Sequence, residues 1–510
     1  MAQMKDYTLK DYLAVLTERG FLVKNGIRGH EDVLVRNLTY NSTEVLKDTL
    51  FICKGVSFRA KYLEDAVKSG AVCYISEREY PLDKQVPFII VNDIRKAMPV
   101  IANMFYNAAW EDFKLIGITG TKGKSTTTYY IKAILDDYLE SQNLIESAMI
   151  SSIDLFDGVE RKETHITTPE AFELHRHFRH AADSGIRYLE MEASSQALKY
   201  DRVNEILFDV GVFLNISEDH ISPIEHENLE DYFRSKLRIF ERSKVGCVNL
   251  DSDFGNQVLE AAKQCPKVIT FGTREPADIY GYNIRKEGHS ILFNVRCARF
   301  DEPFELTMPG LFNVENALAA IAIACALDIP LEFIHSGLKR ARSSGRMELY
   351  ASKDSKVIAI VDYAHNKLSF DKLFSSVLEE YPGYGIVTIF GCPGKKAFVR
   401  RRDLGLIAGE FSKKVYLVAE DPGYEPVEEI SRDIAQYVEQ KGCPYEMIED
   451  RGEAISKAVH EVTENTVILI TGKGNETRQK YGCEYLDYPS DVEFTVKYIK
   501  EYDELHPVRG

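Results

Sequence analysis

The chain has 510 residues, and at about 150 residues per domain this length predicts three domains. Its 45% hydrophobic and 28% charged residues are ordinary for a globular protein and exclude a fibrous or disordered chain. The net charge of −16 argues against a nucleic-acid partner, and it means that local cations must gather any anionic substrate. Nine scattered cysteines without a C-x-x-C pair predict reduced thiols in the cytoplasm. The longest apolar run, Ala317 to Leu327, is too short to span a bilayer, so we expect no membrane insertion.

Residues 1–112 predict a small α/β domain. Short apolar runs typical of strands occur at 50–53, 71–75 and 87–91, and stretches with helical periodicity separate them.

From residue 113 onward, buried strands alternate with amphipathic helices, which favours parallel sheets with right-handed crossovers. A polar stretch at 343–345 separates a central domain, 113–344, from a C-terminal domain, 345–510. The strands expected in the central domain are 115–119, 188–192, 210–214, 245–250 and 268–271. Those expected in the C-terminal domain are 357–361, 386–390, 415–419 and 467–471. Two such domains in succession predict a catalytic cleft between them.

The segment Gly120–Ser125 (GTKGKS) follows one of these strands and opens a helix. It is a shortened phosphate-binding loop, because the generic Walker spacing needs a glycine where this chain has Ile118. Glycines let backbone N–H groups converge on an anion, and the helix N-terminus adds partial positive charge. We predict that Lys124 contacts the terminal phosphates of a nucleotide and that Ser125 offers its hydroxyl to Mg²⁺. The structural alternative is an ordinary turn.

Two further side chains follow neighbouring strands. Glu192 ends the strand 188–192, and His220 comes after the strand 210–214. Ligands bind at the carboxyl ends of strands in open α/β sheets, and hard cations prefer oxygen ligands. We therefore expect both residues to serve a divalent cation beside the loop, with a solvated carboxylate and a structural histidine as the alternatives.

Other candidates are ambiguous from the residues alone. Lys236 lies in a predicted helix, where a lysine is usually solvated. Asp362 and His365 follow a strand and suit a nucleotide ribose, and Arg346 lies in a loop, where a guanidinium suits phosphate or carboxylate. The run Arg400–Arg402 is equally compatible with a solvated helix start.

In this order the motifs resemble those of the Mur ligases, ATP-dependent amide-forming enzymes of peptidoglycan precursor synthesis. The resemblance covers nearly the whole chain and is strongest to the MurE type, which adds the third amino acid to UDP-MurNAc-L-Ala-D-Glu. The matching segments are Gly120–Ser125, Thr167–Pro169, Glu192–Ser195, Asn215–His220, Gly310–Asn316, Gly345–Glu348, Asp362–His365 and Gly472–Glu476. It implies a UDP-sugar-binding domain at 1–112, a central P-loop ATP-binding domain at 113–344 and a Rossmann-like amino-acid-binding domain at 345–510.

The resemblance also implies the residues of each subsite. For ATP they are Gly120, Thr121, Lys122, Gly123, Lys124, Ser125, Thr126, Asn316, Arg346, Asp362 and His365. For Mg²⁺ they are Ser125, Glu192, His220 and Lys236, the last as a carbamylated lysine. For the UDP-MurNAc-dipeptide they are Ser42, Thr167, Thr168, Ser194 and Arg202. For the incoming amino acid they are Arg401, Glu420, Asp421, Gly472 and Glu476. The implied catalytic residues are Lys124, Glu192, His220 and Lys236.

The implied reaction has two steps. The D-Glu side-chain carboxylate attacks the γ-phosphorus of ATP, which gives an acyl phosphate and ADP. The incoming amine then attacks the activated carbonyl and releases phosphate. Positioning and neutralisation of phosphate charge supply most of the catalysis in such transfers. We expect a cytoplasmic monomer that acts on small molecules with ATP and Mg²⁺.

The specificity loop departs from the commonest family pattern. Enzymes of this type that use meso-diaminopimelate typically have an Asp-Asn-Pro-Arg motif, whose arginine pairs with the distal carboxylate. The equivalent stretch here is Glu420–Glu425 (EDPGYE), with Gly423 at the arginine position. A buried distal carboxylate left unpaired costs roughly a few kcal/mol, whereas Glu420, Asp421 and Glu425 attract an ammonium. We predict L-lysine as the substrate; L-ornithine fits the same charge logic, and meso-diaminopimelate is the alternative.

Three other departures affect the details: Asn41–Thr43 replaces Asp-Ser-Arg, Asn475 replaces the histidine of Gly-Lys-Gly-His-Glu, and His365–Leu368 replaces His-Thr-Pro-Asp. Two other functions stay open from the sequence. One is a folylpolyglutamate synthetase, a relative that lacks the N-terminal UDP-binding domain. The other is a nucleotide-binding scaffold without turnover, which has no need of a second metal site at Lys236.

Overall fold

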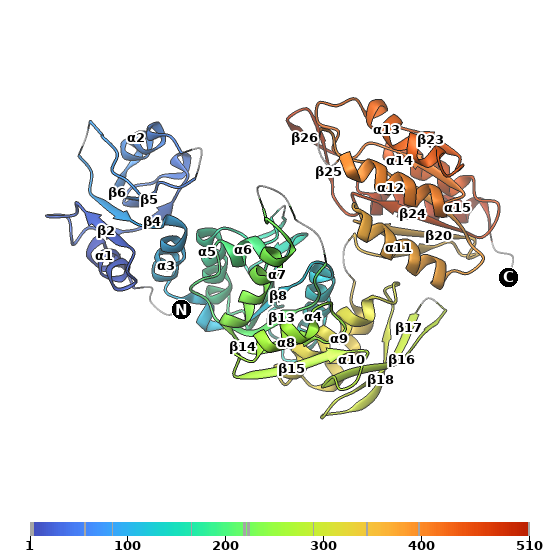
Figure 1. Cartoon of the computed structure of the whole chain (residues 1–510), viewed down its shortest axis with the longest axis horizontal. Helices are drawn as coiled ribbons and strands as arrows, with labels where there is room; N and C mark the ends of the chain where they lie inside the picture. Colours follow the sequence, from blue (N-terminus) through green and yellow to red (C-terminus); the bar gives the residue numbers. More distant parts are fainter. Residues whose placement is uncertain are drawn as a thin grey trace. The chain divides into compact units, whose positions relative to one another are not determined.

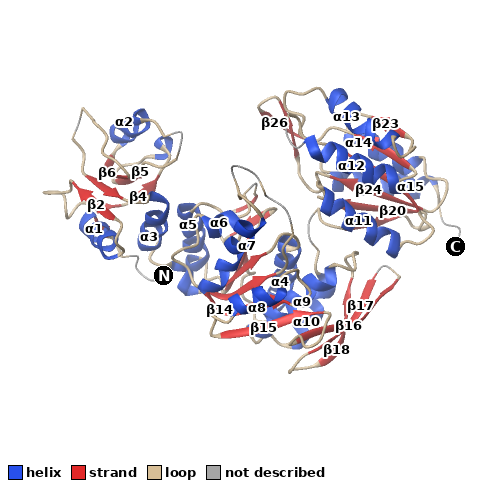
Figure 2. Ribbon diagram, viewed as in Figure 1, coloured by secondary structure: helices blue, strands red, loops and turns tan. Residues whose placement is uncertain are grey.

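The computed structural model describes residues 5–55, 58–83, 85–164, 166–217, 221, 225–288, 290–342, 345–395 and 398–507. The chain forms two compact units, one of residues 1–280 and 318–337 and the other of residues 281–317 and 338–510. In both units helices pack along the strands of α/β sheets (Figures 1 and 2). The division into three domains at residues 112/113 and 344/345 remains a prediction. None of the nine cysteines, all of which lie among the described residues, forms a disulfide. No helix in the described part of the chain is long and apolar enough to cross a membrane.

The first sheet of the first unit has the order β2-β7-β6-β5-β4, and only β2 runs antiparallel to its neighbour. Its strands are β2 (Leu22–Asn25), β4 (Asn37–Thr39), β5 (Thr49–Ile52), β6 (Ala71–Ser76) and β7 (Phe88–Val91). The accompanying helices are α1 (Leu9–Glu18), α2 (Ala60–Ser69) and α3 (Ile94–Phe105). The strands predicted at 50–53, 71–75 and 87–91 are confirmed. Ala171 and Phe172 belong to the same apolar core, so this domain packs on the start of a helix of the next one.

The second sheet of the first unit has the order β11-β10-β9-β12-β8-β13-β14-β15, and it is parallel from β9 to β15. Its parallel strands are β8 (Lys114–Thr119), β9 (Ala148–Ile150), β12 (Tyr188–Glu192), β13 (Phe208–Phe213), β14 (Ser243–Asn249) and β15 (Lys267–Gly272). A hairpin of β10 (Asp154–Phe156) and β11 (Arg161–Glu163) extends one edge. The helices are α4 (Lys124–Glu140), α5 (Ala171–Asp183), α6 (Ser195–Lys199), α7 (Leu229–Leu237) and α8 (Gly255–Ala262). All five strands predicted for this region are confirmed.

The next elements along the chain, after β15, are β16 (Ile279–Glu287), β17 (Ser290–Arg296), β18 (Asp301–Leu306), α9 (Asn313–Ala326) and α10 (Leu331–Arg340). Strands β17 and β18 pair antiparallel. They belong to the second unit.

The main sheet of the second unit has the order β19-β20-β24-β21-β22-β23, parallel except at β19. Its strands are β19 (Glu348–Ala351), β20 (Val357–Asp362), β21 (Gly385–Phe390), β22 (Lys414–Leu417), β23 (Tyr445–Met447) and β24 (Thr466–Thr471). The helices are α11 (Lys367–Glu380), α12 (Phe398–Phe411), α13 (Val427–Glu439), α14 (Arg451–His460) and α15 (Asp491–Leu505). A small hairpin is formed by β25 (Arg478–Tyr481) and β26 (Glu484–Asp487). The four strands predicted here are confirmed.

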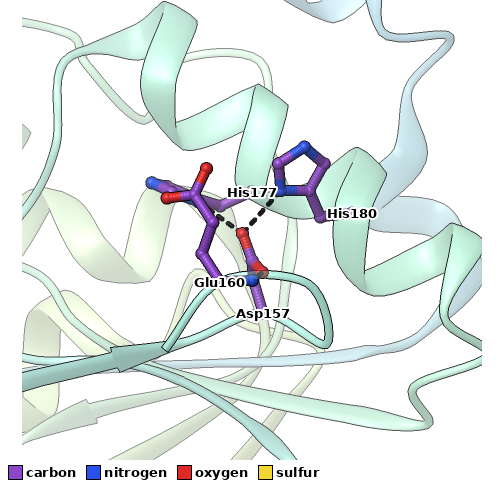
Figure 3. Close-up of side chains that lie close together, drawn as sticks. All are labelled: Asp157, Glu160, His177 and His180. Atoms are coloured by element: carbon purple, nitrogen blue, oxygen red, sulfur yellow. Dashed lines mark hydrogen bonds and ion pairs between the residues drawn. The ribbon is translucent and has the colours of Figure 1, made fainter. Parts of the chain in front are cut away.

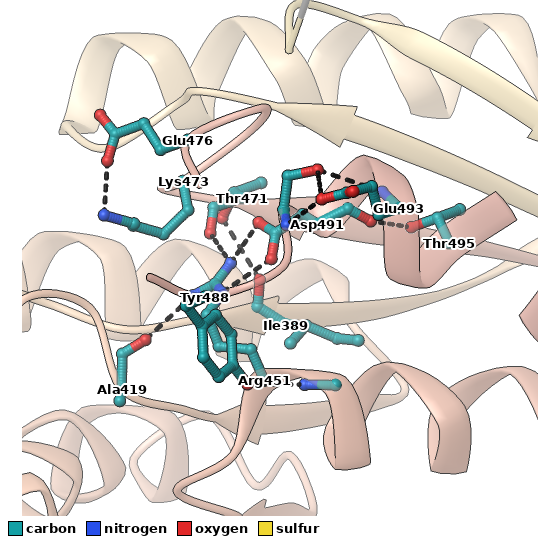
Figure 4. A network of polar contacts seen from close by, with 12 residues as sticks. Ile389, Ala419, Arg451, Thr471, Lys473, Glu476, Tyr488, Asp491, Glu493 and Thr495 are labelled. Carbon is teal, nitrogen blue, oxygen red and sulfur yellow. Dashed lines mark hydrogen bonds and ion pairs between the residues drawn. The ribbon is translucent and has the colours of Figure 1, made fainter. Parts of the chain in front are cut away.

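A buried ion pair joins two helices of this unit to the ends of its strands. Arg451, at the start of α14, and Asp491, at the start of α15, are each 1% exposed and form two hydrogen bonds of 2.8 and 2.6 Å (Figure 4). Arg451 also donates to the carbonyl oxygens of Ala419 and Thr471, at 3.2 and 2.8 Å. The pair therefore holds together the segments that follow β22 and β24.

We expect the Asp491→Ala substitution to destabilise the second unit by about 3–5 kcal/mol, because it leaves the Arg451 guanidinium buried without its carboxylate. The measurement is calorimetric unfolding, with the fluorescence of the single tryptophan, Trp110, reporting separately on the first unit. Asp487→Ala is the matched control, since Asp487 is 96% exposed and lies 3.8 Å from Arg478. Equal transition temperatures for the two variants would contradict a stabilising role of the Arg451–Asp491 ion pair.

Candidate active site

The segment Gly120–Ser125 forms the turn between β8 and α4, as predicted for a phosphate-binding loop. Gly123 has φ +85°, in the left-handed region that glycine enters without strain. The Nζ of Lys124 donates to the carbonyl oxygens of Gly120 and Thr121, at 3.0 and 3.2 Å. The loop is anchored by Asn215, whose Oδ1 accepts from the backbone N of Lys122 at 2.9 Å and whose Nδ2 donates to the carbonyl of Lys122 at 3.0 Å. The loop is thus held by a residue at the end of the neighbouring strand β13.

Glu192 and Ser125 lie on two sides of one serine. The Oε1 of Glu192 accepts from the N and Oγ of Ser152, at 2.9 and 3.2 Å, and the Oγ of Ser152 lies 3.1 Å from that of Ser125. Glu192 is 1% exposed, so the alternative of a solvated carboxylate is wrong. Ser152 was not identified from the sequence, where nothing marks it. His220 lies outside the described residues.

Lys236 is buried, and the interpretation of a solvated helix lysine is therefore wrong. It is 1% exposed, and its Nζ donates to the carbonyl oxygen of Gly120 at 2.8 Å. The ammonium also lies 4.4 Å from the centre of the Tyr232 ring. The structure thus gathers Lys124, Ser125, Glu192 and Lys236 around one loop.

A cavity of about 830 Å³ lies between the N-terminal sheet and the start of α5. Four cationic residues line it: Lys54, Arg78, Arg95 and Arg202. Aromatic rings of Phe58, Tyr80 and Tyr200 and the acidic residues Glu77, Asp93 and Glu170 also line it. Only Arg202 among these residues was identified from the sequence. Lys54 and Arg202 each pair with Glu170 at 2.7 Å. The four cations still outnumber the three carboxylates, which fits an anionic ligand despite the chain's net charge of −16.

Thr168, Ser194 and Arg202 form a connected group next to Glu192. The Oγ1 of Thr168 donates to the carbonyl of Glu192 at 2.8 Å and accepts from the backbone N of Ser194 at 3.0 Å. Arg202 donates to the carbonyl of Thr168 at 3.0 Å and pairs with Glu170 at 2.7 Å. Thr167 precedes this group and is half-buried, whereas Ser42, in a short 3₁₀ turn, does not line the cavity.

In the second unit, Arg346, Asp362 and His365 surround Tyr363. The Arg346 guanidinium lies 4.8 Å from the centre of the Tyr363 ring, and the His365 ring packs edge-on at 5.2 Å. Asp362 accepts from the backbone N of Met347 at 2.9 Å and of Ala364 at 2.7 Å, which fixes the two loops together. Asn316, on α9, donates to the Oδ1 of Asn313 at 3.0 Å.

A second group in this unit lies at the ends of β22 and β24. The Nζ of Lys473 contacts Asp421 at 3.1 Å and Glu476 at 2.5 Å, and Glu476 also accepts from the hydroxyl of Tyr363. Glu420 is 9% exposed and forms no hydrogen bond or ion pair with another described residue. Gly472 has φ +102°, and a Cβ there would lie 2.3 Å from the Oε2 of Glu420. The structure thus brings together Glu420, Asp421, Gly472 and Glu476.

Arg401 is engaged by acidic residues of its own unit. It is 2% exposed, so it is not part of a solvated helix start. Its guanidinium donates to both carboxylate oxygens of Glu425, at 2.9 and 2.8 Å, and to Asp433 at 2.8 Å. Glu425, expected to attract an ammonium, is therefore already paired.

Burial shifts the titration of one member of this group. Removal from water raises the pKa of Glu420 to about 7, although the nearby Arg451 and Lys473 favour its charged form. Glu420 is thus poised between a neutral and a charged state near neutral pH.

The parallel sheet with its phosphate-type loop defines a P-loop α/β protein. The family model described as Mur ligase middle domain matches residues 118–324, and that described as Mur ligase, glutamate ligase domain matches residues 345–474. The chain is 36% identical to the UDP-N-acetylmuramoyl-L-alanyl-D-glutamate--L-lysine ligase of Streptococcus agalactiae, over 92% of this chain and 93% of that protein. It is 34% identical to the ligase of the same name from Enterococcus faecalis, over 98% and 97%. The chain belongs to the Mur ligase family.

The fold agrees with this membership. A solved structure titled UDP-N-acetylmuramoyl-L-alanyl-D-glutamate--2,6-diaminopimelate ligase superposes with a TM-score of 0.67 and 23% identity, covering 99% of this chain and 100% of that one. The predicted α/β fold of a Mur ligase is confirmed.

Proposed function

We propose that this chain is an ATP-dependent ligase that adds L-lysine to UDP-MurNAc-L-Ala-D-Glu and releases ADP and phosphate. Membership of the family and the names of two relatives, both L-lysine ligases, support the reaction. The observation on which the proposal rests is the gathering of Lys124, Ser125, Glu192 and Lys236 around one phosphate-type loop.

In this proposal the loop holds the phosphates of ATP, and Lys124 turns from the loop carbonyls to the γ-phosphate. Mg²⁺ fits the oxygen atoms present, because the hydroxyl of Ser125 and the carboxylate of Glu192 are joined through Ser152. When bound, Mg²⁺ neutralises phosphate charge as the acyl phosphate forms. Lys236, proposed to be carbamylated, contributes a further carboxylate beside the same loop. Arg346, Asp362 and His365 are proposed to contact the nucleotide.

The cavity beside α5 is proposed to bind the UDP-MurNAc-dipeptide. Its four cations suit a diphosphate, and its aromatic rings suit a uracil base. Thr168, Ser194 and Arg202 lead from this cavity to Glu192 and are proposed to position the dipeptide's D-Glu carboxylate. A folylpolyglutamate synthetase lacks the N-terminal domain, which supplies most residues of this cavity, so the cavity favours the present proposal.

The choice of L-lysine rests on Glu420. Asp421, Glu425 and Glu476 are each paired with a cation of the chain, whereas Glu420 makes no ion pair with a described residue and is buried. We propose that Glu420 accepts the side-chain ammonium of the incoming amino acid. Gly423 leaves no guanidinium to pair with a distal carboxylate, which disfavours meso-diaminopimelate.

The test is phosphate release from ATP and Mg²⁺ in the presence of UDP-MurNAc-L-Ala-D-Glu, with L-lysine, L-ornithine and meso-diaminopimelate offered separately. We expect release with L-lysine. Preference for L-ornithine or meso-diaminopimelate would overturn the choice of amino acid but not the ligase, and no release with any of them would overturn the ligase.

The state of Glu420 predicts a pH dependence. Its pKa is raised to about 7, so below that pH the carboxyl is increasingly protonated and loses its attraction for an ammonium. We expect the KM for L-lysine to rise by about tenfold in total as the pH falls from 8 to 6, because the ionised fraction of a carboxyl with a pKa of about 7 falls by that factor. In Glu420→Gln the KM is expected to be high and to lose this dependence. An equal slope in both proteins would contradict the assignment.

A further inference from the structure

A second cluster of metal-binding side chains lies where the β10–β11 hairpin packs against α5, apart from the loop described above. Asp157 and Glu160 come from the turn of the hairpin, and His177 and His180 are three residues apart on the helix (Figure 3). One ligand atom from each of the four residues lies within 4.8 Å of the others.

The carboxylate of Asp157 is the centre of this cluster. Its Oδ1 accepts from the backbone N–H groups of Val159 and Glu160, at 2.9 and 2.7 Å. Its Oδ2 lies 2.6 Å from the Nδ1 of His177 and 2.8 Å from the Nδ1 of His180. The turn thus fixes the carboxylate so that one oxygen faces both imidazoles. Burial disfavours its charged form, but the hydrogen bonds from His177 and from the turn outweigh burial and hold its pKa below the ordinary value.

The cluster is rigidly supported and still has access to solvent. Asp157 is fully buried and His177 is 2% exposed, whereas the side chain of His180 is 26% exposed. At Gly158, a Cβ would lie 2.5 Å from the Cβ of Ser184, so the turn contacts the end of α5 closely. An ion can therefore reach a preformed set of ligands from the side of His180.

We propose that Asp157, Glu160, His177 and His180 bind one divalent transition-metal ion of the Zn²⁺ type. Two carboxylates and two neutral imidazoles give the site a charge of −2, which such an ion balances. Imidazole nitrogen favours Zn²⁺ over Mg²⁺, which prefers oxygen ligands. This chemistry separates the site from the oxygen-rich one around Ser125 and Glu192.

The observed distances are close to those that binding requires. Tetrahedral Zn²⁺ with bonds of about 2.0–2.1 Å places its ligand atoms about 3.3 Å apart. The Asp157 oxygen, at 2.6 and 2.8 Å from the two ring nitrogens, therefore needs to move away from them by about 0.5–0.7 Å. All four ligand atoms already lie within 4.8 Å of one another, and the more distant pairs need to move closer. On binding, each imidazole stays neutral and carries its proton on Nε2, so that the lone pair of Nδ1 is available to the metal. Glu160 exchanges its ion pairs with Lys162 and Arg176 for the metal.

A site with four protein ligands is closed, which indicates a structural rather than a catalytic ion. The ion joins the hairpin to α5. Strand β10 begins two residues after Ser152, which contacts Glu192, so the hairpin is continuous with the segment beside the phosphate-type loop.

The test uses the full-length chain, stripped of metal with EDTA and then dialysed against Zn²⁺ in excess Mg²⁺. We expect one Zn²⁺ per chain and a rise in melting temperature, and we expect His180→Gln to weaken Zn²⁺ binding at least tenfold. His30→Gln is the matched control, because His30 is exposed and distant from the cluster in the sequence. Equal Zn²⁺ affinity in His180→Gln and in the wild-type chain, or no binding to the wild-type chain, would overturn the proposal.

A second measurement needs no variant and so does not depend on the folding of one. X-ray absorption at the zinc edge of the loaded wild-type chain is expected to show only nitrogen and oxygen ligands, with the scattering signature of two imidazoles. A sulfur ligand or a single imidazole would place the ion elsewhere and overturn the proposal.

Discussion

In the Lys124→Ala variant, kcat for amino-acid-dependent phosphate release is expected to fall by about a thousandfold, the effect of removing a charge-stabilising donor from a transition state. The Nζ of Lys124 lies within hydrogen-bond distance of two carbonyl oxygens of the loop, at the first residue of α4. In the proposed reaction it turns from there to the phosphate that is being transferred. Alanine is a good helix former, so the variant is expected to fold normally. Steady-state phosphate release, with circular dichroism to verify the fold, measures the effect.

The matched control is Lys114→Ala, which removes a lysine at the opposite end of the same strand. The side chain of Lys114 is 57% exposed and pairs with Asp209. Wild-type kcat is expected for this control. A Lys124→Ala variant that retained a tenth of the wild-type kcat would exclude Lys124 from the reaction.

Replacing Gly423 by arginine is expected to raise the ratio of kcat/KM for meso-diaminopimelate to that for L-lysine by about tenfold or more. A hydrogen bond to a charged group contributes about 1.5–3 kcal/mol, and 1.4 kcal/mol corresponds to a factor of ten. A Cβ at this position meets no obstacle, because the nearest atom to it is the carbonyl oxygen of Gly482 at 3.8 Å. Gly423 has φ +57°, so any other residue costs roughly 1–2 kcal/mol in backbone strain.

The Gly423→Gln variant separates the effect of the guanidinium from the effect of backbone strain, because it imposes the same backbone penalty with an uncharged side chain. It is expected to lower both kcat/KM values together and to leave their ratio unchanged. If Gly423→Arg also left the ratio unchanged, the loop would not be the determinant of the amino acid.

Buried strands were predictable from the sequence, because continuous apolar runs between helical stretches mark parallel strands. Short or exposed strands could not be predicted in this way. All three residues of β11 and all four of β26 are exposed, so no apolar pattern distinguishes them from loops. Strand β17 was missed although its alternation of buried Ile291, Phe293 and Val295 was visible in the sequence.

The position of candidate residues at the ends of strands was predictable where they follow a strand or match a motif, as at Lys124 and Glu192, whereas their roles stay a prediction. The burial of Lys236 could not be predicted, because its ammonium is bound by a carbonyl group 116 residues away in the sequence. The cavity cations Lys54, Arg78 and Arg95 were missed because no local pattern marks them. The cluster of Asp157 with His177 and His180 was also hidden, since it requires the unpredicted hairpin to pack on α5.

The specificity loop is held by main-chain bonds. Gly423 donates its N–H to the carbonyl of Lys480 at 3.1 Å and accepts from the N–H of Gly482 at 2.7 Å, so the β25–β26 hairpin fixes its path. Main-chain bonds do not depend on which side chain occupies position 423. The side chain at position 423 can therefore vary in evolution while the path of the loop is kept, with no insertion or rebuilding.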